Sequence, residues 1–289
     1  MRKIKLTDNL RKHLAFTPGI RFMIAAAFFY SVMAVFVKLA GSRLPSQEIV
    51  FVRSFLAFLM TFFLIKKGNI SITGKRRGLL ILRAIFGFFG LSAFFYTLTV
   101  LPIADSTLLL YTNPLITALI APFILKEVNT NKQWGLYLAG FLGIILIIKP
   151  TFSLDPYATI IGLSGAVCTS IAYVTVRILG KSDHEFTIIL YFSGLATLAS
   201  LPETTYSFVW PTIPEWLALL GVGIATQIAQ VFMTRGLHRE TAARATNVGY
   251  MNVLFSIGWG LLIWDQFPDP LAITGAGLII ISVFFVNRS

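Results

Sequence analysis

Long apolar segments follow one another along almost the whole chain, and no other feature restricts the fold as much. There are ten, and most have the roughly 17 to 25 residues that a helix needs to cross a hydrocarbon layer of ~30 Å. They cover residues 20–40, 49–65, 78–98, 104–125, 134–148, 158–179, 186–201, 215–237, 243–264 and 271–286. In lipid each segment must satisfy its own backbone hydrogen bonds, which a helix does. The sequence therefore predicts an all-α integral membrane protein with ten transmembrane helices.

The positive charges of the chain are distributed unequally between its loops. The formal charge is +12, but the Lys and Arg residues are separated by the apolar segments and do not form one basic surface. Nineteen of the 24 fall on the side of the N-terminus, whereas only Arg43 and Lys149 fall on the opposite side. Positive residues accumulate in cytoplasmic loops. We therefore expect both termini in the cytoplasm, a basic cytoplasmic tail over residues 1–19, and no nucleic-acid partner.

The two halves of the chain match each other at a nearly constant offset. A shift of 139 positions pairs Lys38 with Arg177, and it also pairs the motif Tyr-x-Asn at 111–113 with the same motif at 250–252. Each copy, over residues 20–148 and 158–287, contains five of the apolar segments. Because five is odd, the second copy crosses the membrane in the opposite orientation. Inverted repeats of this kind are typical of transporters, whose substrate site lies between the repeats.

Residues 83–127, RAIFGFFGLSAFFYTLTVLPIADSTLLLYTNPLITALIAPFILKE, resemble the EamA-type members of the drug/metabolite transporter superfamily. The shared features are an arginine at the start of the third helix, a short turn of the LPIAD kind, and a fourth helix with a central proline and a terminal glutamate. Through the duplicated layout the resemblance covers nearly the whole chain. It implies two five-helix repeats around a central cavity, alternating access, and a lining drawn mainly from the first, third, fourth, sixth, eighth and ninth helices.

The fourth helix contains a proline in the middle of an apolar stretch. Pro114 has no backbone N–H, so the carbonyl of Leu110 loses its helical partner and we expect the helix to bend there. Such a bend is tolerated in lipid where a side chain or cavity water bonds to the free carbonyl. Asn113 then either faces the cavity or bonds to a neighbouring helix. In the second repeat Val253 stands where Pro114 would be, so the ninth helix need not bend.

Polar side chains on the implied cavity helices are the candidate substrate-binding residues. They are Tyr30, Tyr111, Asn113, Tyr173, Gln227, Gln230, Tyr250 and Asn252, with Pro114 as the candidate hinge. An aromatic or amide side chain packed between helices is an equally good interpretation of each one taken alone. The set is better supported, because every member falls on a helix that the resemblance places around the cavity.

Charged residues within the apolar segments are few. Lys38, Arg53 and Arg83 lie inside them, and each either extends toward the membrane surface or attracts an anionic or zwitterionic substrate. All twelve acidic residues lie in tails, loops or segment ends. Ion-driven carriers commonly keep a carboxylate in the membrane interior, so we expect transport without proton or sodium coupling.

Enzyme function is disfavoured by the remaining chemistry. The three histidines lie in the tail or loops without a metal-ligand spacing, and the single cysteine, Cys168, cannot form an internal disulfide. We therefore expect no catalytic residue, no metal and no cofactor. The sequence predicts a multi-pass transporter of a small polar metabolite, an amino acid or related compound, in the inner (plasma) membrane of a bacterium, as a monomer or homodimer. A flippase for lipids or amphiphiles on the same helical frame is the alternative.

Overall fold

The computed structural model describes residues 16–40, 43–152, 155–286 and 288. Over these ranges the chain forms helices and no strands. The helices are α2 (Pro18–Ala40), α3 (Ser46–Lys67), α4 (Arg77–Val100), α5 (Ile103–Leu110), α6 (Asn113–Leu125), α7 (Asn131–Ile148), α8 (Pro156–Leu179), α9 (Glu185–Ser207), α10 (Ile213–Arg239), α11 (Ala242–Val248), α12 (Met251–Trp264) and α13 (Pro270–Val286). Most of the expected basic tail, residues 1–15, lies outside the described residues.

The helical spans correspond to the ten predicted segments one for one. Within the described residues, nine helical spans are long and apolar enough to cross a membrane, with α5–α6 and α11–α12 each counted as one span, and the shorter α13 is the tenth. The all-α, multi-span fold class is therefore confirmed. The seventh segment extends furthest beyond its prediction, because α9 continues past Pro202 to Ser207. Its last turns are polar, and Thr204 Oγ1 donates to the Ser200 carbonyl at 2.8 Å.

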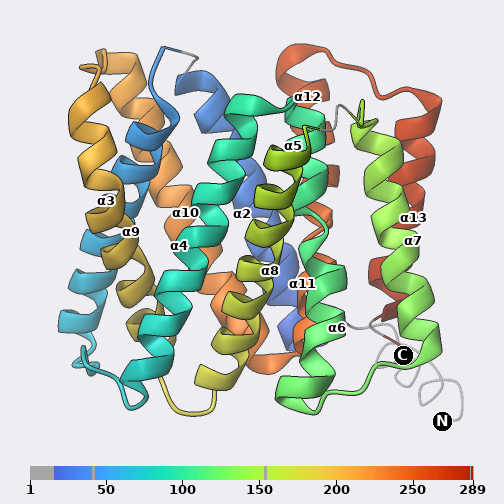
Figure 1. The fold of residues 1–289 in the computed structure, drawn as a ribbon, viewed down its shortest axis with the longest axis horizontal. Helices are drawn as coiled ribbons and strands as arrows, with labels where there is room; N and C mark the ends of the chain where they lie inside the picture. The colour runs from blue at the N-terminus through green and yellow to red at the C-terminus, as the bar shows by residue number, and fades with distance from the viewer. Residues whose placement is uncertain (1–15, 41–42, 153–154, 287, 289) are drawn as a thin grey trace, which may run out of the picture.

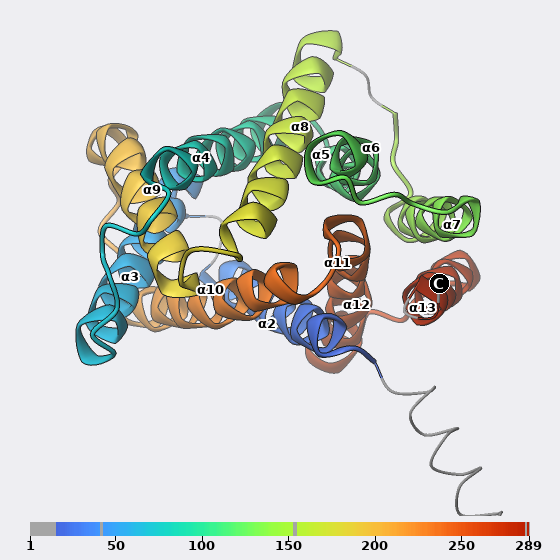
Figure 2. The same ribbon diagram turned by 90° about the horizontal axis from the view of Figure 1, so that it is seen from below.

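The two repeats interlock rather than pack as separate halves. The chain enters α2 from the lower face in Figure 1 and enters α8 from the upper face, so the repeats have opposite orientations. The tightest helix pairs join one repeat to the other: α2 with α10, α4 with α8, α3 with α9, and α7 with α13. Seen from below, the first three pairs and the broken helices surround a central space, while α7 and α13 pack together at one side (Figure 2).

Small residues allow the closest of these approaches. A Cβ atom on Gly165 of α8 would lie 2.5 Å from the Cβ of Ala93 on α4. The two helices can therefore cross at this point only because position 165 has no side chain, and small residues are the usual means of close helix packing in membranes.

The fourth and ninth helices are both interrupted, each at the tyrosine of the repeated motif. The fourth helix breaks at Tyr111–Thr112, just before Pro114, which becomes the second residue of α6. The expectation that the ninth helix need not bend is wrong, because it breaks at Gly249–Tyr250. Four backbone N–H groups here, those of Gly249, Tyr250, Asn252 and Val253, donate to the carbonyl of residue i−3 in place of i−4, at 3.0 to 3.2 Å. The break in the ninth helix contains no proline. It contains Gly249, and a glycine weakens a helix by about 1 kcal/mol.

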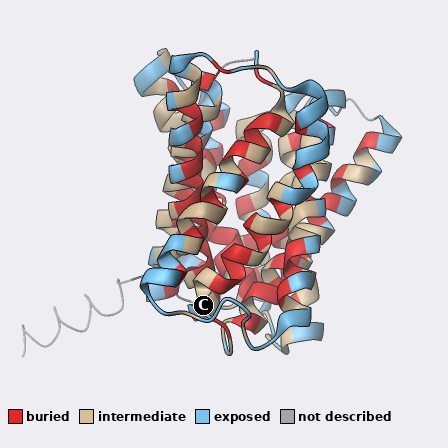
Figure 3. Ribbon diagram, turned by 90° about the vertical axis from the view of Figure 1, so that its left-hand side faces the viewer, coloured by how far each residue is buried: buried red, intermediate tan, exposed pale blue. Residues whose placement is uncertain are grey.

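Many large apolar residues are exposed, and the buried residues face the inside of the molecule (Figure 3). Phe63, Phe123, Leu198 and Leu262 on four different helices are between 66% and 87% exposed. A soluble protein seldom exposes so many large apolar groups together, whereas lipid accommodates them. The exposed surface is thus that of a membrane-embedded protein.

Candidate functional site

A cavity of about 600 Å³ lies between the two repeats. It is lined by residues of α2, α4, α5, α6, α8, α10, α11 and α12, the helices that the resemblance implies. Two further helices contribute to the wall, since Ile49 and Arg53 come from α3 and Phe192 comes from α9. The volume suits a small metabolite.

Most of the predicted site residues meet at this cavity. Its lining includes Tyr30, Arg53, Arg83, Tyr111, Asn113, Pro114, Tyr173, Gln230 and Asn252. They come from seven separate helical elements, so the fold brings together side chains up to 222 positions apart in the sequence. Whether each one contacts substrate stays a prediction.

Three predicted residues lie away from the lining. Gln227 is 2% exposed, and its Nε2 donates to Thr61 Oγ1 on α3 at 2.8 Å, so it joins two helices. Tyr250 is fully buried behind the cavity wall, where its hydroxyl donates to the Tyr111 carbonyl at 3.2 Å. Lys38 is exposed, with its Nζ 3.7 Å from the centre of the Trp264 ring. The expected contact of Gln227 and Tyr250 with substrate, and the attraction of an anionic substrate by Lys38, have no support in this geometry.

The cavity lining follows the internal repeat. Ten pairs of lining residues are separated by the offset of 139: Tyr30 and Thr169, Met33 and Ala172, Ala34 and Tyr173, Arg53 and Phe192, Leu91 and Gln230, Phe94 and Met233, Leu98 and Leu237, Thr107 and Thr246, Leu110 and Gly249, and Asn113 and Asn252. The lining also contains apolar residues, such as Phe192 and Met233, that polarity alone does not predict. Applying the offset to the polar candidates would have found Phe192 from Arg53 and Thr169 from Tyr30.

Two guanidinium groups contribute the charge of the cavity, and both belong to the first repeat. Arg83 is 4% exposed and its guanidinium carbon lies 4.3 Å from the centre of the Phe192 ring. Arg53 is half-buried, and its Nη1 approaches the Met33 sulfur at 3.8 Å. The Nε of each is buried without a hydrogen-bond partner. No carboxylate of the described residues forms an ion pair with either one, and no described lining residue is acidic.

The two helix interruptions contact each other at one edge of the cavity. Tyr111 Oη donates to Asn252 Oδ1 at 2.9 Å, and the rings of Tyr111 and Tyr250 are 5.9 Å apart. Asn252 Nδ2 in turn donates to the Ala27 carbonyl on α2 at 3.2 Å. The repeated Tyr-x-Asn motifs therefore join the fourth and ninth helices where both have lost their regular hydrogen bonds. A bound solute at this point would contact both repeats at once.

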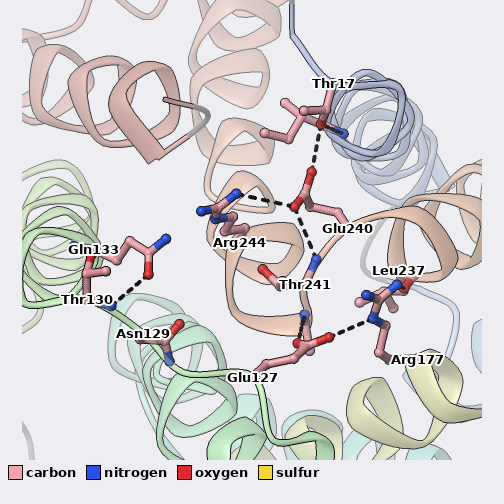
Figure 4. A network of polar contacts seen from close by, with 12 residues as sticks. Thr17, Glu127, Asn129, Thr130, Gln133, Arg177, Leu237, Glu240, Thr241 and Arg244 are labelled. Atoms are coloured by element: carbon pink, nitrogen blue, oxygen red, sulfur yellow. Dashed lines mark hydrogen bonds and ion pairs between the residues drawn. The ribbon is translucent and has the colours of Figure 1, made fainter. Parts of the chain in front are cut away.

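Ionic contacts close the lower side of the molecule (Figure 4). Glu127 Oε1 accepts a hydrogen bond from Arg177 Nε at 2.8 Å, and its Oε2 accepts one from the Ala242 backbone N–H at 2.9 Å. Arg177 Nη1 also donates to the His238 carbonyl at 2.7 Å. This group, which we call the Glu127 latch, ties the end of the fourth helix to α8 and to the turn between α10 and α11.

A second carboxylate extends the closure on the same side. Glu240 Oε2 accepts a hydrogen bond from Thr17 Oγ1 at 2.7 Å, and Arg244 Nη1 lies 3.7 Å from Glu240 Oε1. Thr17 immediately precedes α2, so this contact fixes the entry of the first helix (Figure 4). The first helix and the α10–α11 turn are thus held together below the cavity.

Burial of the lining residues differs between the two ends of the cavity. At the lower end Met23, Met233 and Leu237 are no more than 5% exposed. Toward the upper end Ala34 and Ile103 are exposed. Above them the ion pair of Arg43 with Glu215 joins the loop after α2 to α10 at the upper surface. The lower end is therefore the closed one.

Comparison with known sequences agrees with this architecture. The sequence profile of the EamA-like transporter family matches the chain twice, over residues 17–149 and 157–288. The chain belongs to the EamA-like transporter family. Since this is a family of transporters, the chain is a multi-pass membrane transporter and not an enzyme.

Two named relatives of this EamA-like protein are transporters of small metabolites. It is 33% identical to the pseudopaline exporter CntI of Pseudomonas aeruginosa over 274 residues, which cover 94% of this chain and 96% of the relative. It is 25% identical to the S-adenosylmethionine uptake transporter of Rickettsia prowazekii, over 98% of this chain and 96% of that one. A solved crystal structure shares the fold with a TM-score of 0.82 at 18% identity, covering 93% and 96% of the two chains.

Proposed function

We propose that this EamA-like transporter moves a small anionic or zwitterionic metabolite, such as an amino acid derivative, by alternating access through the central cavity. The observation that carries the proposal is the pair of Arg53 and Arg83, whose Nε atoms are buried beside the cavity without a partner. An unpaired buried charge is strongly unfavourable. An anionic group on the substrate would supply the missing partner through charge-assisted hydrogen bonds.

Other lining groups suit the polar remainder of such a substrate. The buried Oε1 of Gln230 has no hydrogen-bond partner and can accept one from a substrate ammonium. Tyr30 and Tyr173 offer hydroxyl groups, while Met33, Phe94 and Phe192 offer apolar contact area. The names of two relatives, a pseudopaline exporter and an S-adenosylmethionine uptake transporter, support a small metabolite as the substrate.

We further propose that the protein lies in the inner membrane of a bacterium with both termini in the cytoplasm. The lower face in Figure 1 is then cytoplasmic, and the structure corresponds to the outward-facing state. A reporter active only in the cytoplasm should work after Ser289 and fail in the loop at Pro211, between α9 and α10. Activity at Pro211 with silence at Ser289 would reverse the orientation.

The proposed substrate class is tested by ligand-induced stabilisation. A ligand that binds the native state raises its melting temperature. We expect stabilisation of the purified protein by carboxylate-bearing amino acid derivatives, with S-adenosylmethionine as one probe, and none by their amides. Counterflow of the stabilising compounds should follow in proteoliposomes. Equal stabilisation by acids and amides contradicts the anion site, and scrambling of a fluorescent phospholipid without counterflow would favour the flippase.

A further inference from the structure

We infer that the substrate carries two anionic groups, one bound by Arg53 and the other by Arg83. The inference rests on the proposed function and makes it more specific. It starts from two guanidiniums in one cavity, each with a buried Nε that has no hydrogen-bond partner and neither with an ion pair among the described residues. A single carboxylate would leave the other arginine unpaired in a site of low dielectric, where an uncompensated charge is costly.

The two arginines start from different depths along the helix direction. Arg53 lies 14 residues above the lower end of α3, and Arg83 lies six residues above the lower end of the antiparallel α4. At 1.5 Å per residue, their Cα atoms differ by about 12 Å along the helix direction. Arg83 is near the closed end and Arg53 is nearer the upper end. A substrate with separated anionic groups would span this interval.

The repeat offset shows that the two positive charges are a departure from internal symmetry. The positions equivalent to Arg53 and Arg83 in the second repeat are Phe192 and Val222. Phe192 lines the same cavity and receives the Arg83 guanidinium on its ring. Both charges therefore belong to the first repeat, and a substrate bound to both has a single orientation in the cavity.

The groups between the arginines are suited to an uncharged linker. Tyr30 also lines the cavity, and its hydroxyl contacts only the weak acceptor Met233 Sδ, at 3.6 Å, among the described residues. On α4 the lining residues at heights between the two arginines are Gly87 and Gly90, which present no polar side chain. The chemistry that fits is a flexible dicarboxylate or a related dianion whose linker is partly apolar.

The test compares ligands with one and two carboxylates on the intact protein. Unbranched dicarboxylates from succinate to pimelate are titrated against the purified transporter beside monocarboxylates of the same chain length. At one length the dicarboxylate should bind roughly tenfold to a hundredfold more tightly, the range expected for one additional charge-assisted contact. In Arg53→Gln and in Arg83→Gln this preference should fall to nearly one.

Controls separate a binding role from a structural one. Arg77→Gln, on the exposed start of the same helix α4, removes the same charge outside the cavity and should keep the preference. The unliganded Arg53→Gln and Arg83→Gln proteins should melt at or above the parent temperature, because each loses an unpaired charge.

Different binding results would overturn the two-point attachment and the proposed anion transport. If monocarboxylates and dicarboxylates bind equally, but Arg83→Gln abolishes binding of both, the anion site stands and the two-point attachment is wrong. The two-point attachment is also wrong if only one of the two variants lowers the preference for dicarboxylates over monocarboxylates. If no carboxylate binds, or if binding is unchanged in both variants, the proposed anion transport fails as well.

Discussion

Asn113 Nδ2 donates a hydrogen bond of 2.7 Å to the carbonyl of Leu110. This is the carbonyl that Pro114 deprives of its helical donor, because position 114 has no N–H. The side chain one residue before the proline thus replaces the missing backbone bond. The sequence predicted that Asn113 either faces the cavity or bonds to a neighbouring helix. Its amide instead bonds to the backbone of its own helix. Asn113 does line the cavity, but one of its two amide N–H donors is already engaged.

A double-mutant cycle tests this relationship. Asn113→Ala should lower the unfolding free energy by about 1–3 kcal/mol, the cost of an unsatisfied buried carbonyl. In the Pro114→Ala background the same change should cost less than about 1 kcal/mol, because the restored N–H of residue 114 can donate to Leu110. Thermal melts of the four proteins measure both values. Additive effects would show that Asn113 stabilises the helix in some other way.

Pro114→Ala is also expected to slow transport while the protein remains folded. With a donor at position 114, α5 and α6 can form one continuous helix, and the interruption loses its flexibility. We expect counterflow to fall several-fold with the melting temperature held or raised, since gating steps often limit turnover. Val253→Ala, at the equivalent position in α12, is the matched control, because its backbone N–H already bonds to Tyr250. Full transport activity in Pro114→Ala would remove this hinge from the mechanism.

The Glu127 latch should control access from the lower side. Removing its charge by Glu127→Gln or Arg177→Gln should weaken the closed state by roughly 1–2 kcal/mol, which is about 5- to 30-fold in its population ratio. In a Cys168→Ser background, Leu237→Cys places a thiol at a fully buried lining position near this side. We expect faster labelling of this thiol from the lower face by a membrane-impermeant maleimide. The same labelling rate as in the parent would mean that the latch has only a structural role.

Arg43→Gln is the matched control for the latch. It breaks an ion pair, the one with Glu215, on the upper surface. Labelling at position 237 from below should not increase in this variant. An increase as large as in Arg177→Gln would indicate a general loosening of the fold and would contradict a specific closure at Glu127.

Transport is expected to proceed without a proton gradient. The described lining of the cavity contains two guanidiniums and no carboxylate, so it lacks the group that usually binds a coupling cation. Counterflow in proteoliposomes should therefore keep its rate when an uncoupler collapses the gradient. Uphill accumulation driven by an imposed pH step would show that another group, such as a cavity tyrosine, carries the proton.

Local physical chemistry made the helices predictable from the sequence. The thickness of the bilayer fixes the length of each apolar run, and so ten helices could be placed to within a few residues of most of their ends. The offset of 139 predicted two equivalent halves, and Pro114 predicted the interruption of the fourth helix. These signals depend on residues that are near one another in the chain or that repeat at a fixed spacing.

The choice of residues that face the cavity was decided by tertiary structure. Gln227 and Gln230 are three residues apart on α10, yet one bonds to Thr61 and the other lines the cavity. The difference lies in α3, which packs against one side of α10 and supplies the hydroxyl. Arg53 and Arg83 face the same space because α3 and α4 both flank it, and the second interruption forms without a proline where Tyr250 reaches Tyr111. Hydropathy indicates only that a segment lies in the membrane. Whether it faces lipid, a neighbouring helix or a cavity depends on helices far away in the chain.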